Sequence, residues 1–502
     1  MKKMRILALA MALAMTASVF AGCSNNSGTA STGDDGGSTN NTDVPTLEWY
    51  GIGGTVPADF DDGIAAINDY LAEKNIGAKV NVTVYEWGAY EENFRRMING
   101  GDYFDIMFAW GSTYNQFVQQ GAFMDITEKV QSVTPDLYNA IPQELWTGAQ
   151  IDGKIYAVPT YKDSSMTQFW YFDHELVEKY NIDVKSVHTM DDLTPIFKQV
   201  KEGEGDTFYP VYLTKGNPWN GFFNMFDDLG TGLQALGVRV DDQKRKVVNV
   251  LEDEEVLHNL GLLRDWYEAG YINQDANVSE ENYKNCFFGS GQGWPAAAIG
   301  WATNQNIKQY DLTDPIDGPI YTSSTVQGSM QAIYAGSKNA DLALKVLELA
   351  NTDTTMRDMM SFGKEGVHFE YVNKELDDGS GETRKAVHQL NTNWTNGWTN
   401  YSQASFFVRT LLDTEPDTQL DEIKAQNDEA TESVCMGFVM DISPIQNELS
   451  ACTQVWSTYK ADLLTGARDP DELVPTMIQE LNDAGLQTII TEAQKQVDEY
   501  FK

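Results

Sequence analysis

The stretch FDIMFAW, residues 104–110, decides the fold class of this chain. It is short and almost continuously apolar, which is typical of a strand buried on both faces of a parallel sheet. Two further strand patterns precede it, TLEWYGI (46–52) and KVNVTVYEW (79–87), and the second alternates valines with polar residues. Helical patterns at 60–75 and 90–100 separate the three strands. Strands that alternate with helices predict an α/β layer with a parallel sheet.

The ends of these strands carry the first candidate binding residues. In an open α/β sheet, ligands bind beyond the C-terminal ends of the strands. Trp87 and Trp110 stand at two of these ends, each beside a glycine, and Glu86 precedes Trp87. We expect the two indole rings to contact a ligand and Glu86 to accept hydrogen bonds from its hydroxyl groups. A packed tryptophan and a solvated glutamate are the alternative readings.

The first 45 residues are not expected to belong to the fold. A basic start, MKKMR, and the apolar stretch 6–20 predict a secretory signal peptide over residues 1–22. The following VFAGC resembles a bacterial lipobox, in which Cys23 is lipidated, although Phe20 stands where Leu is usual; an ordinary cleavage site beside a stray cysteine is the alternative. Residues 23–45, rich in Ser, Thr, Gly and Asn, predict a flexible tether. The protein is therefore expected outside the cytoplasm, held at the cell membrane by a lipid on Cys23.

Three loops place tryptophan among small polar residues, where no core strand is expected. They are GNPWNGF with Trp219 and Asn220, GQGWPA with Trp294, and NTNWTNGWTNYS with Trp394 and Trp398. The apolar face of a pyranose ring stacks on an aromatic ring, and its hydroxyl groups need polar partners. The pattern therefore favours a carbohydrate site, and packed loop tryptophans are the alternative.

Polar candidates follow two strand patterns near the expected passages of the chain. Tyr161, Lys162 and Asp163 come after the proline-interrupted stretch YAVP, and Gln327 and Ser329 precede the strand pattern MQAI. We expect these residues to face the ligand, with Lys162 available to a carboxylate if the sugar is a uronate. A hinge turn is the alternative for the first three.

Charge and motif content limit the classes of function. The net charge is −39, with 74 Asp and Glu against 35 Lys and Arg, and such a field repels nucleic acid. The chain has no GxSxG, HExxH, Walker A or EF-hand motif and no Cys/His cluster, so we predict no metal, no cofactor and no enzymatic activity. A surface-anchored glycoside hydrolase, which needs only two carboxylates, stays open as an alternative. So does a binding protein for peptides or another solute.

Several longer stretches resemble one protein family. They are YAVPTYKD, FWYFDHELVEKYNID, LLRDWYEAGYINQD, SMQAIYAGSKNADLALKVLELAN and FGKEGVHFEYVN. With the lipobox and tether, their order is similar to that of the extracellular solute-binding lipoproteins of bacterial ABC importers. The subgroup they resemble is carbohydrate-binding and LipO-like, of the aldouronate type, and the tail from DISPIQ to the end resembles its C-terminal domain.

The resemblance implies an α/β, two-lobed periplasmic-binding-protein-like fold of type II, with the ligand cleft between the lobes and a helical C-terminal segment. Lobe one would comprise 46–160 plus 318–375, and lobe two 161–317 plus 376–502, with hinges near 160–163, 317–325 and 375–390. The implied function is to capture a carbohydrate, in particular an oligosaccharide, outside the cell. The protein would act as a monomer and deliver the sugar to the permease subunits of an ABC transporter.

Overall fold

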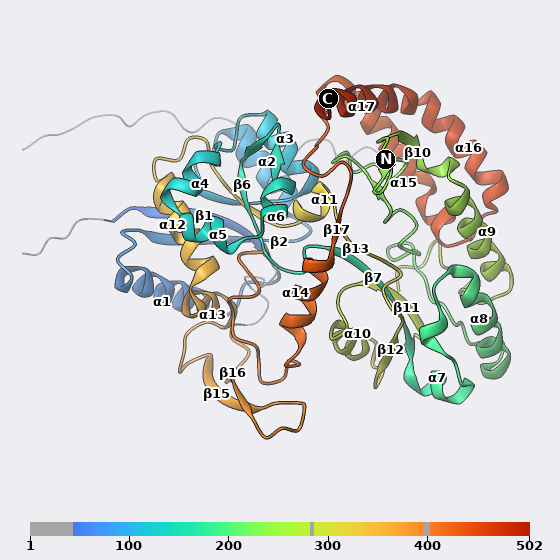
Figure 1. The fold of residues 1–502 in the computed structure, drawn as a ribbon, viewed down its shortest axis with the longest axis horizontal. Coiled ribbons are helices and arrows are strands. Elements are labelled where there is room, and N and C mark those ends of the chain that lie inside the picture. The colour runs from blue at the N-terminus through green and yellow to red at the C-terminus, as the bar shows by residue number, and fades with distance from the viewer. Residues whose placement is uncertain (1–43, 282–285, 395–401) are drawn as a thin grey trace, which may run out of the picture. The chain divides into compact units, whose positions relative to one another are not determined.

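The computed structural model describes residues 44–502, apart from 282–285 and 395–401. Two hydrophobic cores organise these residues, and each core lies against its own principal sheet. We call the part around the first core lobe one and the part around the second core lobe two (Figure 1).

Lobe one is built on a five-stranded sheet of order β2-β1-β3-β14-β6. As predicted, β1 runs parallel to both β2 and β3, whereas β14 is antiparallel to β3 and β6. Strand β3 is central in this sheet, between β1 and β14, and all of its residues are buried, which explains its continuous apolarity. The strands are β1 (Thr46–Gly53), β2 (Lys79–Glu86), β3 (Ile106–Ala109), β6 (Ala157–Pro159) and β14 (Met330–Ile333).

Helices and short strands complete lobe one, and their apolar faces join its core. The residues at i, i+3 and i+4 spacing in 60–75 do form a helix, as predicted, with Ile64, Ile67 and Leu71 buried. The helices are α1 (Phe60–Glu73), α2 (Tyr90–Gly100), α3 (Gly111–Gln119), α4 (Thr127–Val133), α5 (Pro135–Ala140), α6 (Gln143–Gly148), α11 (Ser323–Val326), α12 (Ala340–Thr352) and α13 (Thr354–Phe362). A small ladder pairs β4 (Gln150–Ile151) with β5 (Lys154–Ile155).

Lobe two is centred on the aromatic strand β7 (Met166–Asp173), whose partners β11, β12 and β13 are all antiparallel to it. These strands are β11 (Phe288–Gln292), β12 (Tyr310–Leu312) and β13 (Asp317–Tyr321), with β17 (Thr431–Glu432) beside β13. A smaller sheet joins β8 (Phe226–Asp227), β9 (Leu236–Arg239) and β10 (Val247–Asn249). The helices are α7 (His174–Tyr180), α8 (Met190–Glu204), α9 (Glu254–Glu268) and α10 (Ala297–Gln305).

The C-terminal segment is helical, as predicted, and contributes to the core of lobe two. Its helices α15 (Gln446–Leu464), α16 (Pro470–Asp483) and α17 (Leu486–Tyr500) pack on one another, and α15 and α16 also contact α9. Their apolar side chains, including Met477 and Ile489, are fully buried in the second core. This segment is therefore part of the fold of lobe two rather than an appendage.

The third passage between the lobes lies later in the chain than 375–390. Strands β15 (Phe369–Glu375) and β16 (Thr383–Gln389) form a hairpin that packs against Phe362 of α13. Trp394 and Ala404 then belong to the first core, although residues 376–502 were assigned to lobe two. The passage to lobe two is made after residue 404, through α14 (Gln419–Glu429) and β17.

None of the helices within 44–502, outside the two gaps, combines the length and apolar character needed to cross a membrane.

Candidate functional site

An exposed pair of tryptophans stands at the C-terminal ends of β2 and β3. Trp87 is 47% exposed and Trp110 38% exposed, which is unusual for side chains of this size. Both contact Tyr90 edge to face, with ring centroids 6.2 and 6.1 Å apart, respectively. Phe108 packs against Trp87 and Tyr90 from within the core. We call Trp87, Tyr90, Phe108 and Trp110 the aromatic platform.

The backbone around Trp110 orients its ring. Trp110 is the extended residue before α3, and Gly111 follows it with φ +45°, a conformation that favours glycine. The Gly111 N–H donates to the carbonyl oxygen of Gln327 at 2.8 Å, and the Thr113 hydroxyl donates to the Trp110 carbonyl at 2.6 Å. The end of β3, the turn at Gly111 and the start of α3 therefore hold Trp110 at the C-terminal end of the strand, the position expected from the sequence.

Two of the polar candidates are buried parts of the scaffold. Gln327 is 1% exposed, and its Nε2 donates to the Gly148 carbonyl at 2.9 Å. The Ser329 hydroxyl donates to the Thr160 hydroxyl at 3.2 Å. Glu86, in contrast, is exposed beside Trp87. Gln327 thus supports the turn behind Trp110 through its backbone rather than presenting its amide to solvent.

Tyr161, Lys162 and Asp163, which follow β6 and Thr160, lie at the first passage between the lobes. Tyr161 is 8% exposed and packs against Phe407, with ring centroids 4.3 Å apart. Lys162 Nζ lies 3.0 Å from Asp163 Oδ1 in a largely buried ion pair. Because Lys162 is already paired with a carboxylate, a uronate would have to compete with Asp163 for it.

Lobe two brings polar side chains from one loop and the strands β7, β11 and β13 together around Asn220. Gln168 Nε2 donates to Asn220 Oδ1 at 2.9 Å and also contacts the Ser290 hydroxyl, which itself donates to Asn220 at 3.0 Å. Asn224 Nδ2 donates to Asp317 Oδ2 at 3.1 Å and to Gln168 Oε1 at 3.5 Å. We call these five residues the amide cluster. Such side chains match the donors and acceptors of sugar hydroxyl groups.

Two cavities adjoin the amide cluster. One of about 220 Å³ is lined by Gln168, Asn220 and Asp317 together with aromatic side chains. A smaller one of about 60 Å³ is lined by Asn220, Ser290 and, from β7, Tyr171. Burial raises the pKa of the Asp317 carboxyl, and the Asn224 hydrogen bond partly offsets this rise. Asn220 is the one residue of this cluster that the sequence predicts as a ligand contact. Gln168 could have been found as the one amide inside the aromatic strand MTQFWYF.

The remaining loop tryptophans have different surroundings. Trp219 is 3% exposed and stacks on Phe288 at 5.3 Å, so it belongs to the core. Trp394 is 4% exposed, stacks on Phe60 at 5.5 Å, and leaves no room for a side chain at Gly63. Trp398 lies outside the described residues.

Trp294 is half-buried, and its indole Nε1 is buried without a hydrogen-bond partner among the described residues. Two bonds from α14 hold its loop. Gln426 Nε2 donates to the Gly293 carbonyl at 2.9 Å, and the Ala296 N–H donates to Glu422 at 2.7 Å. A donor without a partner in a held loop is a suitable contact for a ligand acceptor.

The described residues contain no group of His, Cys, Asp and Glu side chains that could hold a metal ion. What they do present is an exposed aromatic surface in lobe one and a polar cluster with cavities in lobe two.

Comparisons with known proteins agree on one family over most of the chain. The model of "Bacterial extracellular solute-binding protein" matches residues 56–356, and a domain of unknown function, DUF3502, matches residues 434–502. A carbohydrate ABC transporter substrate-binding protein of Streptococcus pneumoniae serotype 4 is 28% identical over 494 residues, which cover 96% of this chain and 95% of that protein.

Solved structures of the N-glycan transport solute-binding protein NgtS from Streptococcus pneumoniae are similar as well. One has a TM-score of 0.79 at 26% identity and covers 91% of this chain and 99% of its own. The complex of NgtS with Man1GlcNAc has a TM-score of 0.71 at 26% identity, with the same coverage. The complex with Man5GlcNAc has a TM-score of 0.69 at 27% identity and covers 91% of this chain and 98% of its own.

Proposed function

Because the chain belongs to the bacterial extracellular solute-binding proteins, we propose that it captures an oligosaccharide outside the cell and delivers it to the permease of an ABC importer. The observation that carries the carbohydrate part is the aromatic platform. Two tryptophans at the ligand-binding edge of an α/β sheet keep 47% and 38% of their surface in solvent. Their rings offer flat apolar surfaces of the kind on which pyranose rings stack.

The glycan we propose contains mannose and N-acetylglucosamine. NgtS, whose chain this one matches from end to end, has been solved with Man1GlcNAc and with Man5GlcNAc. The amide cluster supports a neutral glycan, because amides and hydroxyls pair with sugar hydroxyls and acetamido groups. The Lys162–Asp163 pair favours a neutral glycan over an aldouronate, since Lys162 already has a carboxylate beside it. The narrower aldouronate subgroup therefore stays a prediction of the sequence.

We place the glycan between the aromatic platform of lobe one and the amide cluster and Trp294 of lobe two. A ligand that contacts both lobes favours the closed arrangement by its added contacts. The buried indole N–H of Trp294 would then find an acceptor in a sugar hydroxyl. Tyr161, Lys162 and Asp163 would line the hinge beside this site.

Isothermal titration calorimetry on residues 44–502 tests this function. The panel is Man5GlcNAc, Man1GlcNAc, an aldouronate and a short neutral peptide, and each mixture is afterwards analysed by chromatography for shorter products. We expect saturable binding of the mannose-containing glycans and no products. Saturation by the peptide alone would overturn the carbohydrate, and release of shorter sugars would instead establish the glycoside hydrolase alternative.

The anchor is a further part of the proposed function. We propose that Cys23 carries the lipid and that residues 23–45 let the binding domain move at the membrane surface. In cells fed labelled palmitate, the wild-type protein should be labelled and sediment with membranes. Cys23→Ala should be unlabelled and leave the membrane fraction; retention of the unlabelled variant would refute the anchor.

A further inference from the structure

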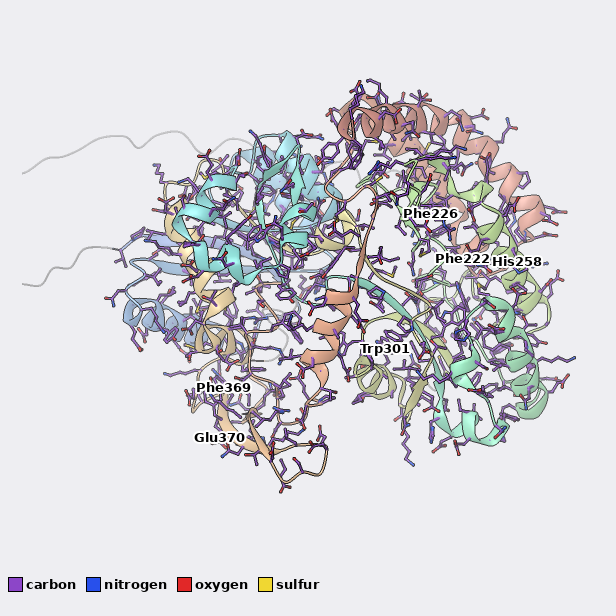
Figure 2. All side chains as sticks on the ribbon, in the orientation of Figure 1. Phe222, Phe226, His258, Trp301, Phe369 and Glu370 are labelled. Carbon is purple, nitrogen blue, oxygen red and sulfur yellow. The ribbon has the colours of Figure 1, made fainter. Side chains whose placement is uncertain are left out.

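The cavity of about 220 Å³ in lobe two is lined by many residues besides those of the amide cluster. It is lined by the loop 219–226, the start of α8, one side of α9 and residues of β7 and β13. Figure 2 labels Phe222 and Phe226 from the segment 219–226 and His258 from α9. No residue of the aromatic platform lines it, so it is a separate feature of the molecule.

Apolar side chains form one side of this cavity. Trp219 and Phe222 are 3% and 8% exposed, and Met225 and Phe226 complete the surface. Trp219 is locked by stacking on Phe288, so the surface is rigid. A rigid aromatic wall suits a flat ring rather than a flexible chain.

The cavity lining also contains a carboxylate in an amide environment. Within the described part of the chain, Asn224 Nδ2 donates a side-chain hydrogen bond to Asp317 Oδ2 at 3.1 Å. An ionised carboxylate can accept about four hydrogen bonds, so Asp317 has capacity left for a ligand. Gly221, with φ +103°, brings the backbone close, since a Cβ there would lie 3.7 Å from Asn224 Nδ2 and 4.0 Å from Asp317 Oδ2.

The charges around the cavity disfavour an anion. Arg239 is occupied by Asp241 and Glu255, at 3.4 and 3.2 Å. His258 contacts Asp191 at 2.8 Å, and His188 also lines the cavity. The lining thus contains the carboxylates of Asp191, Glu255 and Asp317 against one arginine that two acids already neutralise.

We propose that this cavity binds one sugar ring without a negative charge and that Asp317 determines this selectivity by accepting hydrogen bonds from the ring hydroxyls. The inference rests on the proposed carbohydrate function and extends it to a second binding surface. The ring is either one unit of the captured glycan or a free monosaccharide, since both present the same hydroxyl groups. Aromatic side chains and hydrogen-bond acceptors in the lining of one cavity are what such a ring requires.

A series of rings that differ in charge tests the proposal. Glucose, mannose, N-acetylglucosamine, glucosamine and glucuronate are titrated into residues 44–502 and followed by ligand-observed NMR. We expect the uncharged rings and glucosamine to bind, and glucuronate to bind at least about tenfold more weakly because it meets the Asp317 carboxylate. Failure of every ring to bind, or equal affinity for glucuronate and glucose, would overturn the proposal.

Variants assign the effect to this cavity. Asp317→Asn should bring glucuronate and glucose to within about threefold of each other, because it removes the repelling charge. Glu254→Gln removes a carboxylate from the first turn of α9 outside the cavity and should leave the order unchanged. Should Asp317→Asn not fold, Asn259→Trp fills the cavity from α9 and should abolish ring binding. An unchanged order of affinities in Asp317→Asn, or unchanged ring binding in Asn259→Trp, refutes the assignment.

Competition experiments distinguish a unit of the captured glycan from a free monosaccharide. They also test this inference separately from the proposed glycan capture. Displacement of mannose by Man5GlcNAc would show that the cavity holds a unit of the captured glycan, whereas simultaneous binding would show a free-monosaccharide site. Trp110→Ala should weaken Man5GlcNAc but leave free mannose bound. Binding of Man5GlcNAc without any ring in the cavity would leave the proposed function intact and remove only this inference.

Discussion

Trp110 combines high exposure with a well-supported backbone, which makes it the most informative single residue of lobe one. Its ring contacts Tyr90 but is 38% exposed, so its removal costs little packing. We expect Trp110→Ala to weaken Man5GlcNAc binding at least about tenfold, since an aromatic stacking contact and its buried area are lost. The melting temperature should change little. Calorimetric titration and thermal unfolding of the same preparation measure both.

Tyr103 provides the matched control for that experiment. It is 41% exposed and precedes β3, whereas Trp110 follows the same strand, so the two aromatic residues lie at opposite ends of it. Tyr103→Ala should leave the affinity for Man5GlcNAc unchanged. An equal loss in both variants would mean that Trp110→Ala acts through the stability of lobe one rather than through contact.

Asp227 is a buried residue whose titration should make the stability depend on pH in the acid range. Burial raises the pKa of its carboxyl to about 6, although the Ser433 hydroxyl and the Leu229 N–H both donate to it. The folded chain therefore keeps a proton between about pH 4 and 6 that the unfolded chain releases. Because the ionised form is the disfavoured one when buried, the free energy of unfolding should fall as the pH rises through this window, by roughly 3 kcal/mol.

Urea unfolding of wild type and Asp227→Asn between pH 4 and 8 checks this sign. The variant cannot titrate at this position, so the wild type should lose stability relative to it from pH 4 to 7, and the difference should then stay constant. Parallel profiles would show that Asp227 does not titrate in this range.

At the scale of elements, α14 connects the hinge with the loop of Trp294. Asn427 accepts bonds from the Ser165 N–H and hydroxyl, at 3.1 and 3.0 Å, and donates to the Lys162 carbonyl at 2.5 Å. Gln426, the preceding residue, and Glu422, five residues before Asn427, bind the backbone of the loop 293–296. The helix therefore ties the first passage between the lobes to the segment that carries a proposed ligand contact.

Asn427→Ala should lower the free energy of unfolding by about 2–4 kcal/mol, because it removes the acceptor that Asn427 gives to the buried N–H and hydroxyl groups of Ser165. Asp428→Ala is the control at the next position. Its side chain is 59% exposed in an ion pair with Lys424, and its loss should cost about 0.5 kcal/mol or less. Equal effects of the two substitutions in denaturant unfolding would contradict the proposed tie.

The elements that could be predicted are those whose pattern is local. The alternating valines of β2, the apolar run of β3 and the amphipathic repeat of α1 all appear where expected, and the two-lobed α/β solute-binding fold is confirmed. The surroundings of Trp394 could not be predicted, since Phe60 and Gly63 are more than 300 residues away in sequence. The amide cluster likewise joins Gln168, Asn224 and Asp317 from distant segments. Chain order alone does not reveal such partners.

At the scale of the whole molecule, the C-terminal region closes the core of lobe two. The match to DUF3502 begins at residue 434, where the chain has entered lobe two, and it includes α15, α16 and α17. Their buried residues form one continuous core with β7, α8 and α9. A binding surface on lobe two therefore depends on all these segments for its rigidity.

The relation between the lobes should change when the glycan binds. The structure is more similar to NgtS than to its two glycan complexes, although the sequence identities are nearly equal. A difference of this kind arises when two rigid lobes keep their internal folds and alter their relative positions. We therefore expect Man5GlcNAc to favour a closed arrangement by contacting the platform of lobe one and the amide cluster of lobe two together.

Small-angle X-ray scattering of residues 44–502, at 0.15 M salt to screen the strongly negative charge, measures this closure. Saturating Man5GlcNAc should reduce the radius of gyration. Trp110→Ala, at a glycan concentration that saturates the wild type but not the variant, should keep the ligand-free value, because the equilibrium shifts only by the difference in affinity between the two arrangements. An unchanged radius of gyration in the saturated wild type would mean that the glycan binds without closure, and that the permease must then recognise the bound sugar itself.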